Sequence, residues 1–175
     1  MSTEARARSV EIVRLTSADA AVFRELRLEG LRDHPEAFGA SWEDEATQSE
    51  AQFSSRLDDA VVFGARSVDG MRLDGIVGVY RPEAAKTKHK AVIWGMYVRL
   101  RARRAGVGAI LLKTAIDHAS LMVEEVNLTV GLANTSALKL YESAGFKRYG
   151  VEQRALKVGE QYYDEILMSL LLSKR

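Results

Sequence analysis

The feature that most constrains this chain is an apolar run from Ala91 to Val98 that has no polar face. Alternation along a strand divides the run into two apolar sides, one with Val92, Trp94, Met96 and Val98 and the other with Ala91, Ile93, Gly95 and Tyr97. A strand that is apolar on both sides is typical of the centre of a sheet whose two faces are covered. The run therefore predicts a central strand with packed layers above and below it.

The composition is that of an ordinary globular protein, and it excludes several classes of chain. Of the 175 residues, 47% are apolar and 28% are charged, with a formal net charge of +1. These values are unlike those of a disordered tail or a collagen-like fibre. A chain of this length fits a single domain over residues 1–175. The near-neutral balance gives no reason to expect nucleic acid or a membrane as a partner.

Cysteine is absent, and there are three histidines, His34, His89 and His118. Disulfides, thiolate metal sites and cysteine nucleophiles are therefore excluded. The histidines are widely spaced, so we expect no metal site. Charges interrupt the stretch from Met1 to Arg14, and the longest apolar runs are far shorter than the roughly 20 residues needed to cross a bilayer. We therefore expect a cytoplasmic protein.

The hydrophobic pattern predicts helices and strands in a mixed order. In the first half of the chain the pattern predicts a strand over 10–15, a helix over 16–33 that stops before Pro35, and a second helix from Glu43 to about Leu57. It then predicts two strands, 61–65 and 73–80, that are joined by a turn at Asp69-Gly70. The second half predicts a helix over 109–120, a strand over 126–130, a helix over 134–144 closed by Gly145, and two last strands with a turn at 158–160. This order favours an α+β fold with a strand–helix–strand crossover in the middle of its sheet.

Directly after the central strand comes the segment Arg103-Arg104-Ala105-Gly106-Val107-Gly108, and then an amphipathic helix. Glycines remove the Cβ atoms that keep an anion away from the backbone, and a helix N-terminus adds partial positive charge. The loop therefore indicates a phosphate site made of main-chain N–H groups, which the two arginines could supplement. It is neither a Walker A loop nor a dinucleotide fingerprint. The alternative is a glycine turn that only lets the strand and helix pack closely.

A second group of candidate residues lies on the short helix near the C-terminal end. Asn134, Ala137 and Tyr141 are spaced so that they share one helix face. Asn134 can cap the helix or hold a ligand amide, and Tyr141 has a phenol that can donate a proton to a leaving group. The alternative is an N-cap followed by a half-buried core tyrosine.

Together and in this order, the two segments resemble the GCN5-related N-acetyltransferase family. The matching residues are Met96-Tyr97-Val98, the loop Arg103-x-x-Gly106-x-Gly108, and Asn134, Tyr141, Gly145 and Phe146. The resemblance covers the second half of the chain closely, and the first half only in the order of its elements. It implies a mixed, mostly antiparallel central sheet with flanking helices and a splayed parallel strand pair, here 91–98 and 126–132.

The resemblance also implies that acetyl-CoA binds between the splayed strands as co-substrate. Backbone groups of Met96, Tyr97 and Val98 would pair with the pantetheine arm, which Asn134 and Ala137 would also contact. The residues that would hold the diphosphate are Arg103, Arg104, Ala105, Gly106, Val107, Gly108 and Ala109. Tyr141 would protonate the departing thiolate as general acid. The implied activity is direct transfer of acetyl to a primary amine of a small molecule or peptide, and a homodimer is left open.

One departure from the family concerns the base. Many members carry a glutamate on the fourth strand, where this sequence has Trp94-Gly95-Met96. The amine must lose a proton before it attacks the thioester. The candidates elsewhere are His34, Glu36, Glu83, His89 or ordered water.

The acceptor would bind between residues 32–45 and the turn near 158–163. Phe38 and Trp42 would then form an apolar wall. The segment Glu43-Asp44-Glu45 could attract an ammonium group, but the interpretation that we favour is a helix start that faces water. Tyr162, Tyr163, Asp164 and Glu165 are interpreted as strand residues at the edge of the sheet.

Two other functions are compatible with the sequence. Without the strand glutamate, the chain could be a non-catalytic sensor that binds acyl-CoA or CoA. Arg99, Arg101, Arg103 and Arg104 could instead form a nucleic-acid patch. The sequence pI of about 8.0 and the lack of aromatic residues among these arginines argue against that patch.

Overall fold

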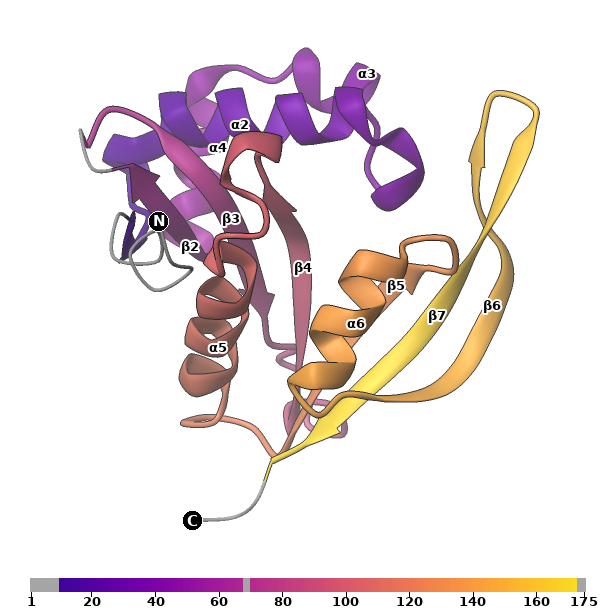
Figure 1. Cartoon of the computed structure of the whole chain (residues 1–175). Coiled ribbons are helices and arrows are strands. Elements are labelled where there is room, and N and C mark those ends of the chain that lie inside the picture. Colours follow the sequence, from indigo (N-terminus) through magenta and orange to yellow (C-terminus); the bar gives the residue numbers. More distant parts are fainter. Residues whose placement is uncertain (1–9, 68–69, 173–175) are drawn as a thin grey trace.

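The computed structural model describes residues 10–67 and 70–172. In this part of the chain seven strands form one sheet in the order β1-β2-β3-β4-β5-β7-β6, and only β4 and β5 are parallel (Figure 1). The strands are β1 (Val10–Arg14), β2 (Val61–Ser67), β3 (Leu73–Tyr80), β4 (Lys90–Val98), β5 (Glu125–Gly131), β6 (Lys147–Val158) and β7 (Gln161–Leu171). The expected α+β class and the mostly antiparallel sheet are confirmed.

Helices cover both faces of this sheet. They are η1 (Ser17–Asp19), α2 (Ala20–Asp33), η2 (Pro35–Ala37), α3 (Trp42–Ala46), α4 (Glu50–Asp59), η3 (Leu100–Ala102), α5 (Val107–Ala119) and α6 (Thr135–Ser143). Figure 1 shows α2, α3 and α4 on one side of the sheet and α5 and α6 on the other. Strand β4 is fourth of seven in the sheet, so the central position predicted for the apolar run is confirmed.

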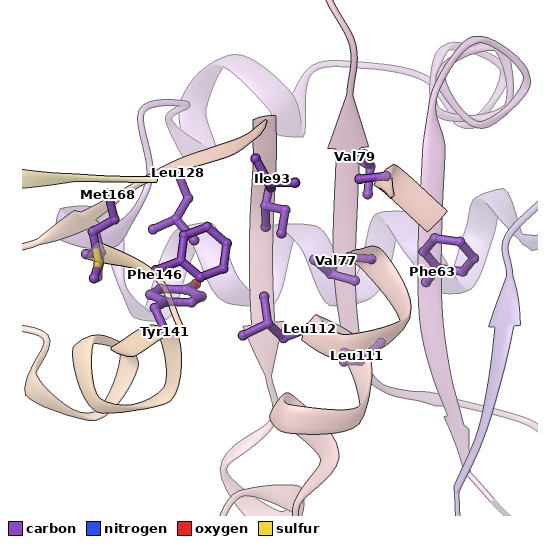
Figure 2. Close-up of a cluster of buried hydrophobic side chains, with 14 of the residues drawn as sticks. Phe63, Val77, Val79, Ile93, Leu111, Leu112, Leu128, Tyr141, Phe146 and Met168 are labelled. Carbon is purple, nitrogen blue, oxygen red and sulfur yellow. The ribbon is translucent and has the colours of Figure 1, made fainter. Parts of the chain in front are cut away.

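Two clusters of buried side chains hold the layers together. The cluster on the α5 and α6 side includes Val77, Ile93, Leu111, Leu112 and Leu128 (Figure 2). The cluster on the α2 and α4 side includes Phe23, Leu26, Phe53 and Ile76. Burying one such side chain contributes about 1.5–3 kcal/mol to the free energy of unfolding. Apolar packing therefore holds helices against both faces of the sheet.

The parallel pair of strands separates along its length. β4 and β5 are paired only at Lys90 with Glu125, Ala91 with Val126 and Val92 with Asn127. Beyond these pairs β4 continues to Val98 and β5 to Gly131 without a bond between them. The splayed strand pair is therefore confirmed, and it leaves unpaired backbone edges on β4 and β5 that face each other.

The predicted division of β4 into two faces is wrong beyond Trp94. Trp94 pairs with Gly78 and Tyr97 pairs with Ile76, so Gly95 and Met96 together lie opposite the single residue between those partners. Gly95 adopts a φ of 63° at this bulge. The extra residue reverses the alternation. As a result Met96 and Val98 pack in the same cluster as Ile93, while Tyr97 belongs to the opposite cluster with Trp94.

The single helix predicted from Glu43 to Leu57 is two helices, α3 and α4. Ser49 begins α4 because its hydroxyl accepts from Gln52 N, while the Gln52 side chain accepts from Ser49 N at 2.7 Å. Such a capping box satisfies two N–H groups that a helix start leaves free. The break turns α4 back against α2.

The first expected helix is divided: residues Ser17–Asp19 form the 3₁₀ turn η1, and α2 begins at Ala20. The other expected boundaries agree with the structure within two residues. Gly145 closes α6 with a φ of 97°, and the amide of Phe146 donates to the Tyr141 carbonyl at 3.1 Å, which is a Schellman motif. Asp69 of the expected hairpin turn lies outside the described residues. Among those residues, no helix has the length and apolar character needed to cross a membrane.

Candidate active site

The loop between β4 and α5 presents N–H groups that the chain itself leaves unused. Ile110 N makes the first hydrogen bond of α5, to the Gly106 carbonyl at 3.1 Å. The four amides before it, from Gly106 to Ala109, donate to no acceptor within residues 10–67 and 70–172. Since a helix cannot satisfy its own first N–H groups, they can bind an anion. The loop therefore keeps the donors that a diphosphate requires.

The two glycines of this loop serve different purposes. Gly106 has a φ of 80°, and a Cβ built on it would meet no atom within 4 Å. A non-glycine residue pays about 1–2 kcal/mol for that conformation, so glycine makes the turn and leaves open space beside the free amides. A Cβ on Gly108 would lie 3.4 Å from Leu140 Cδ2 and 3.5 Å from Met96 Cε. Glycine is therefore needed at 108 because the neighbouring side chains pack closely, and at 106 because the backbone has a positive φ and its amides stay accessible.

The four arginines around this loop are not equivalent. Arg99 and Arg101 form ion pairs with carboxylates of the protein itself. Arg104 is exposed, has a φ of 60° and forms no ion pair with the described residues. Two of the four charges are thus neutralised internally, which weakens the nucleic-acid interpretation and leaves Arg104 next to the free amides.

One hydrogen bond shows which backbone groups of β4 point toward β5. Arg99 N donates to the Asp74 carbonyl at 2.9 Å, and Val98 lies opposite Gly75. Val98 and Gly75 are therefore a non-hydrogen-bonded pair, and the N–H and C=O of Val98 point away from β3 toward the splay. By the same alternation the backbone of Tyr97 bonds β3, and its side chain packs on the α2 face.

Arg103 occupies part of that edge. Its Nε donates to the Val98 carbonyl at 2.9 Å, and its Nη2 lies 3.1 Å from His34 Nε2. The guanidinium carbon lies 5.9 Å from the centroid of the Tyr97 ring. The sequence predicted that Arg103 would face a diphosphate, and the structure places its guanidinium on the Val98 carbonyl and the His34 ring.

Asn134 is the N-cap of α6. Its Oδ1 accepts from Ala137 N at 3.2 Å. The amide of Ala137 is therefore engaged within the helix, while the exposed Asn134 retains its Nδ2 donors for a ligand. The structure thus supports the capping role of Asn134 and is compatible with a ligand contact.

Tyr141 projects from α6 into the apolar cluster on the α5 side. Its ring meets Phe146 edge to face with centroids 6.0 Å apart, and Figure 2 shows both rings beside Leu128. Its hydroxyl makes no hydrogen bond to the part of the chain that the structure describes. Burial raises the pKa of Tyr141 to about 12. The phenol therefore keeps its proton at neutral pH and has no internal partner that competes for it.

A model of the acetyltransferase (GNAT) family matches residues 25–146. The chain belongs to the GNAT acetyltransferase family. The match begins within α2 and ends at Phe146, directly before β6, so it includes the loop, the splay and the α6 helix described above. The family expected from the two motifs in the second half of the chain is confirmed.

Solved structures agree with this assignment of the GNAT fold. An acetyltransferase of the GNAT family from Streptococcus pneumoniae is 22% identical with a TM-score of 0.80, covering 93% of this chain and 99% of that chain. A ribosomal-protein-alanine N-acetyltransferase from Brucella melitensis is 19% identical with a TM-score of 0.76, covering 93% and 99%. A phosphinothricin acetyltransferase from Sinorhizobium meliloti in complex with acetyl-CoA is 16% identical with a TM-score of 0.80, covering 94% and 89%. No curated protein matches the chain.

The base candidates of this GNAT protein lie at two opposite ends of β4. Glu83 and His89 precede the strand, so about eight residues of extended chain, roughly 25 Å, separate them from Val98. His34 lies beside Tyr97 at the other end, with the two ring centroids 6.0 Å apart. Of the candidates, the structure therefore brings only His34 and its neighbour Glu36 to the open end of the splay.

The α2 side of the splay is lined by aromatic and paired charged groups. Phe38 stands edge to face on Tyr97, and the Arg27 guanidinium lies over both Phe38 and Trp94. Trp94 also borders a hollow of about 470 Å³ next to α4. Trp42, the other half of the expected wall, is 40% exposed at the start of α3.

The interpretation of the acidic trio as water-facing is wrong for Glu45. This residue is buried, and its carboxylate accepts from Arg27 Nη2 at 2.9 Å and from Arg56 Nη1 at 3.1 Å. Burial alone would raise the pKa of Glu45, but the two guanidinium groups hold it below its usual value. Glu43 and Asp44 are exposed, as expected.

The sequence did not predict a cluster of polar contacts between Tyr97, Glu29 and Arg99. The Tyr97 hydroxyl donates to Glu29 Oε1 at 3.2 Å, and Arg99 Nε donates to Glu29 Oε2 at 2.9 Å. Burial, followed by the charge of Glu29, raises the pKa of Tyr97. Glu29 lies on a helix seventy residues before Arg99. That separation gives no indication in the sequence that the two side chains are in contact. Glu29 is engaged by this pair and positions the Tyr97 side chain.

Proposed function

We propose that this protein is an acetyl-CoA-dependent N-acetyltransferase that moves an acetyl group to a primary amine of a small molecule or peptide. The observation that carries the proposal is the set of free amides from Gly106 to Ala109 at the open end of the β4–β5 splay. A similar fold has been solved in complex with acetyl-CoA, in the Sinorhizobium meliloti enzyme. The residues present fit a thioester carrier with a diphosphate.

Each part of the carrier has a matching group. The free amides suit a diphosphate because they supply hydrogen-bond donors at a helix start, and Arg104, which pairs with no carboxylate among the described residues, adds a positive charge. The outward N–H of Val98 suits a carbonyl of the pantetheine arm, which would lie along β4 as an extra strand. Asn134 would bind the same arm through its free Nδ2.

Tyr141 is the general acid of this proposal. A thiol ordinarily titrates near 8.5, so a phenol with a pKa of about 12 is a weaker acid than the thiol by about 3.5 units, or about 5 kcal/mol. Full proton transfer from Tyr141 to a free thiolate is therefore uphill by the same amount. Tyr141 donates a hydrogen bond that stabilises the developing thiolate charge, and its proton moves as the acetylated nitrogen passes its surplus proton through water to the phenol oxygen.

A second candidate function is a sensor that binds acyl-CoA or CoA without turnover. The observation that favours it is the absence of a carboxylate on β4, which carries Trp94, Gly95 and Met96 at the bulge. Both functions need the diphosphate site, and only the transferase needs Tyr141 as a proton donor.

Two measurements on the full chain test the proposal. Acetyl-CoA at 100 times its Kd should stabilise the protein by about 2.7 kcal/mol in thermal unfolding. Release of free CoA from acetyl-CoA should then require a primary amine, tested with lysine, spermidine, phenethylamine and a peptide with a free N-terminus. Stabilisation without CoA release would support the sensor, and no stabilisation at millimolar acetyl-CoA would contradict both functions.

A further inference from the structure

Arg103, His34 and Tyr97 meet at the carboxyl end of β4 although they are far apart in the sequence. Arg103 Nη2 lies 3.1 Å from His34 Nε2, and the same guanidinium donates through Nε to the Val98 carbonyl. The Tyr97 ring lies under both side chains, 5.9 Å from the Arg103 guanidinium carbon and 6.0 Å from the His34 ring. One arginine thus binds both the open edge of β4 and the imidazole of His34.

The chemistry of this contact determines which nitrogen of His34 carries the proton. A guanidinium has donors only, so His34 Nε2 must accept from Arg103 and carry no hydrogen. In the neutral ring the proton is then on Nδ1. Glu36 Oε1 lies 3.8 Å from Nδ1, too far for a direct hydrogen bond but close enough to favour a proton there. The lone pair of Nε2 is therefore directed at Arg103.

The backbone places His34 on the acceptor side of the splay. His34 is the C-terminal cap of α2, and the following η2 segment packs against β5 and β6. A Cβ built on Gly131, the last residue of β5, would lie 3.8 Å from the Glu36 carbonyl. The segment from His34 to Ala37 therefore crosses the open end of the splay, from β4 to β5.

We propose that His34 takes the proton from the acceptor's ammonium group and that Arg103 covers it until acetyl-CoA binds. The proposal rests on the proposed transferase function. A diphosphate is a stronger partner for a guanidinium than a neutral carbonyl and an imidazole are. Arg103 therefore leaves Val98 and His34 when the loop amides bind the diphosphate. The carrier thus binds first, and the amine finds a free Nε2 afterwards.

The proton and electron balance of the step is complete without another reactant. His34 Nε2 takes one proton from R–NH₃⁺, and the freed nitrogen lone pair forms the C–N bond while the carbonyl pair moves to oxygen. The pair returns, the C–S bond breaks, and the sulfur takes the Tyr141 proton. The second nitrogen proton passes through water to restore Tyr141, and His34 releases its proton to solvent.

Nitrogen NMR of the histidine side chains tests directly whether Arg103 covers His34 Nε2. The chain has only three histidines, His34, His89 and His118, so their resonances can be assigned one by one. In the free protein we expect His34 as the Nδ1–H form, and addition of CoA should shift its Nε2 resonance. Arg103→Ala should give the CoA-type resonance without CoA, whereas the neighbouring Arg104→Ala should leave the free-protein resonance in place. An Nε2–H form in the free protein, or CoA binding that leaves the Nε2 resonance unmoved, would overturn the proposal.

Kinetics test the proton transfer, using the most active amine of the panel named above. His34→Gln should keep CoA affinity within about twofold and lower kcat about 100-fold or more near neutral pH. The loss should shrink as pH rises and the amine deprotonates by itself, which a purely structural defect would not show. The groups that face His34 are Arg103, Tyr97 and Glu36, and His89→Gln at the far end of β4 is the matched control.

The outcomes separate this inference from the function on which it rests. Unchanged kcat and pH profile in His34→Gln, with an active wild type, would overturn the role of His34 and leave the transferase intact. A wild type that does not bind CoA would overturn both. A kcat loss in His34→Gln that is equal at every pH would also contradict a proton-accepting role.

Discussion

Gly78 of β3 lies directly against the indole ring of Trp94 on β4: a Cβ built on Gly78 would lie 2.2 Å from Trp94 Cε2. The two residues are opposite one another in the antiparallel pair, immediately before the bulge. The close approach fixes the indole on the α2 side of the sheet, next to Arg27. The ring is rigid, so it cannot yield to an added methyl group without moving as a whole.

We therefore expect Gly78→Ala to destabilise the protein by about 1–3 kcal/mol through overpacking. The measurement is urea unfolding. Gly39→Ala is the control, since a Cβ there meets no atom within 4 Å. Trp94→Ala should cancel much of the Gly78→Ala loss in a double-mutant cycle. Independent, additive losses would show that the contact is not what the alanine disturbs.

Removal of the Tyr141 hydroxyl should affect turnover more than binding. Tyr141→Phe should lower kcat about tenfold to a thousandfold while the Kd for acetyl-CoA stays the same. Its hydroxyl has no hydrogen-bond partner among the described residues, so stability at neutral pH should change little. The matched control is Tyr149→Phe on the exposed surface of β6. Unchanged kcat in Tyr141→Phe would mean that the tyrosine only packs.

The raised pKa of Tyr141 predicts a loss of stability at high pH. The folded state holds the phenol proton to a pKa of about 12, and the unfolded state releases it near 10. Stability from this group is therefore complete below pH 10 and declines between pH 10 and 12, by about 3 kcal/mol at most. Unfolding free energies measured across this range should decline less steeply in Tyr141→Phe. Identical slopes for the two proteins would contradict the raised pKa of Tyr141.

The buried carboxylate of Glu45 predicts acid sensitivity. Removing the charge leaves Arg27 and Arg56 without their shared partner, so Glu45→Gln should cost about 3–5 kcal/mol. The control is Glu43→Gln, an exposed change on the same short helix. Because the pKa of Glu45 is lowered on folding, its stabilising effect is present above the unfolded pKa and is lost as pH falls below it. Equal stability of the two variants at pH 7 would exclude this role.

The sequence predicted those parts of the fold that depend on local pattern. The apolar run Ala91–Val98 predicted a central strand, and Gly145 predicted the end of α6. The glycine segment 106–108 predicted free amides at the start of a helix. Each of these depends on residues close together in the chain. Long-range pairing produced the differences: the bulge at Gly95 exists because β4 must match β3, and it reversed the faces of Met96 and Tyr97.

Side-chain partners were the least predictable part of the candidate site. The local sequence does not distinguish Glu45 from Glu43, and only the packing of α3 against α2 makes Glu45 buried and Glu43 exposed. His34 and Arg103 are 69 residues apart. Their contact requires α2, β4 and the loop to be in place together, so no local pattern could have indicated it.

The most direct test of this account is an amide NMR titration of the protein with CoA. The N–H resonances of Gly106, Val107, Gly108 and Ala109 should shift together at a concentration that matches the Kd, and Gly106→Asp should abolish the response. Gly70→Asp, at another open glycine with positive φ, should titrate like the wild type. Binding of CoA with these four resonances unmoved would contradict the diphosphate site, and with it the function proposed from it.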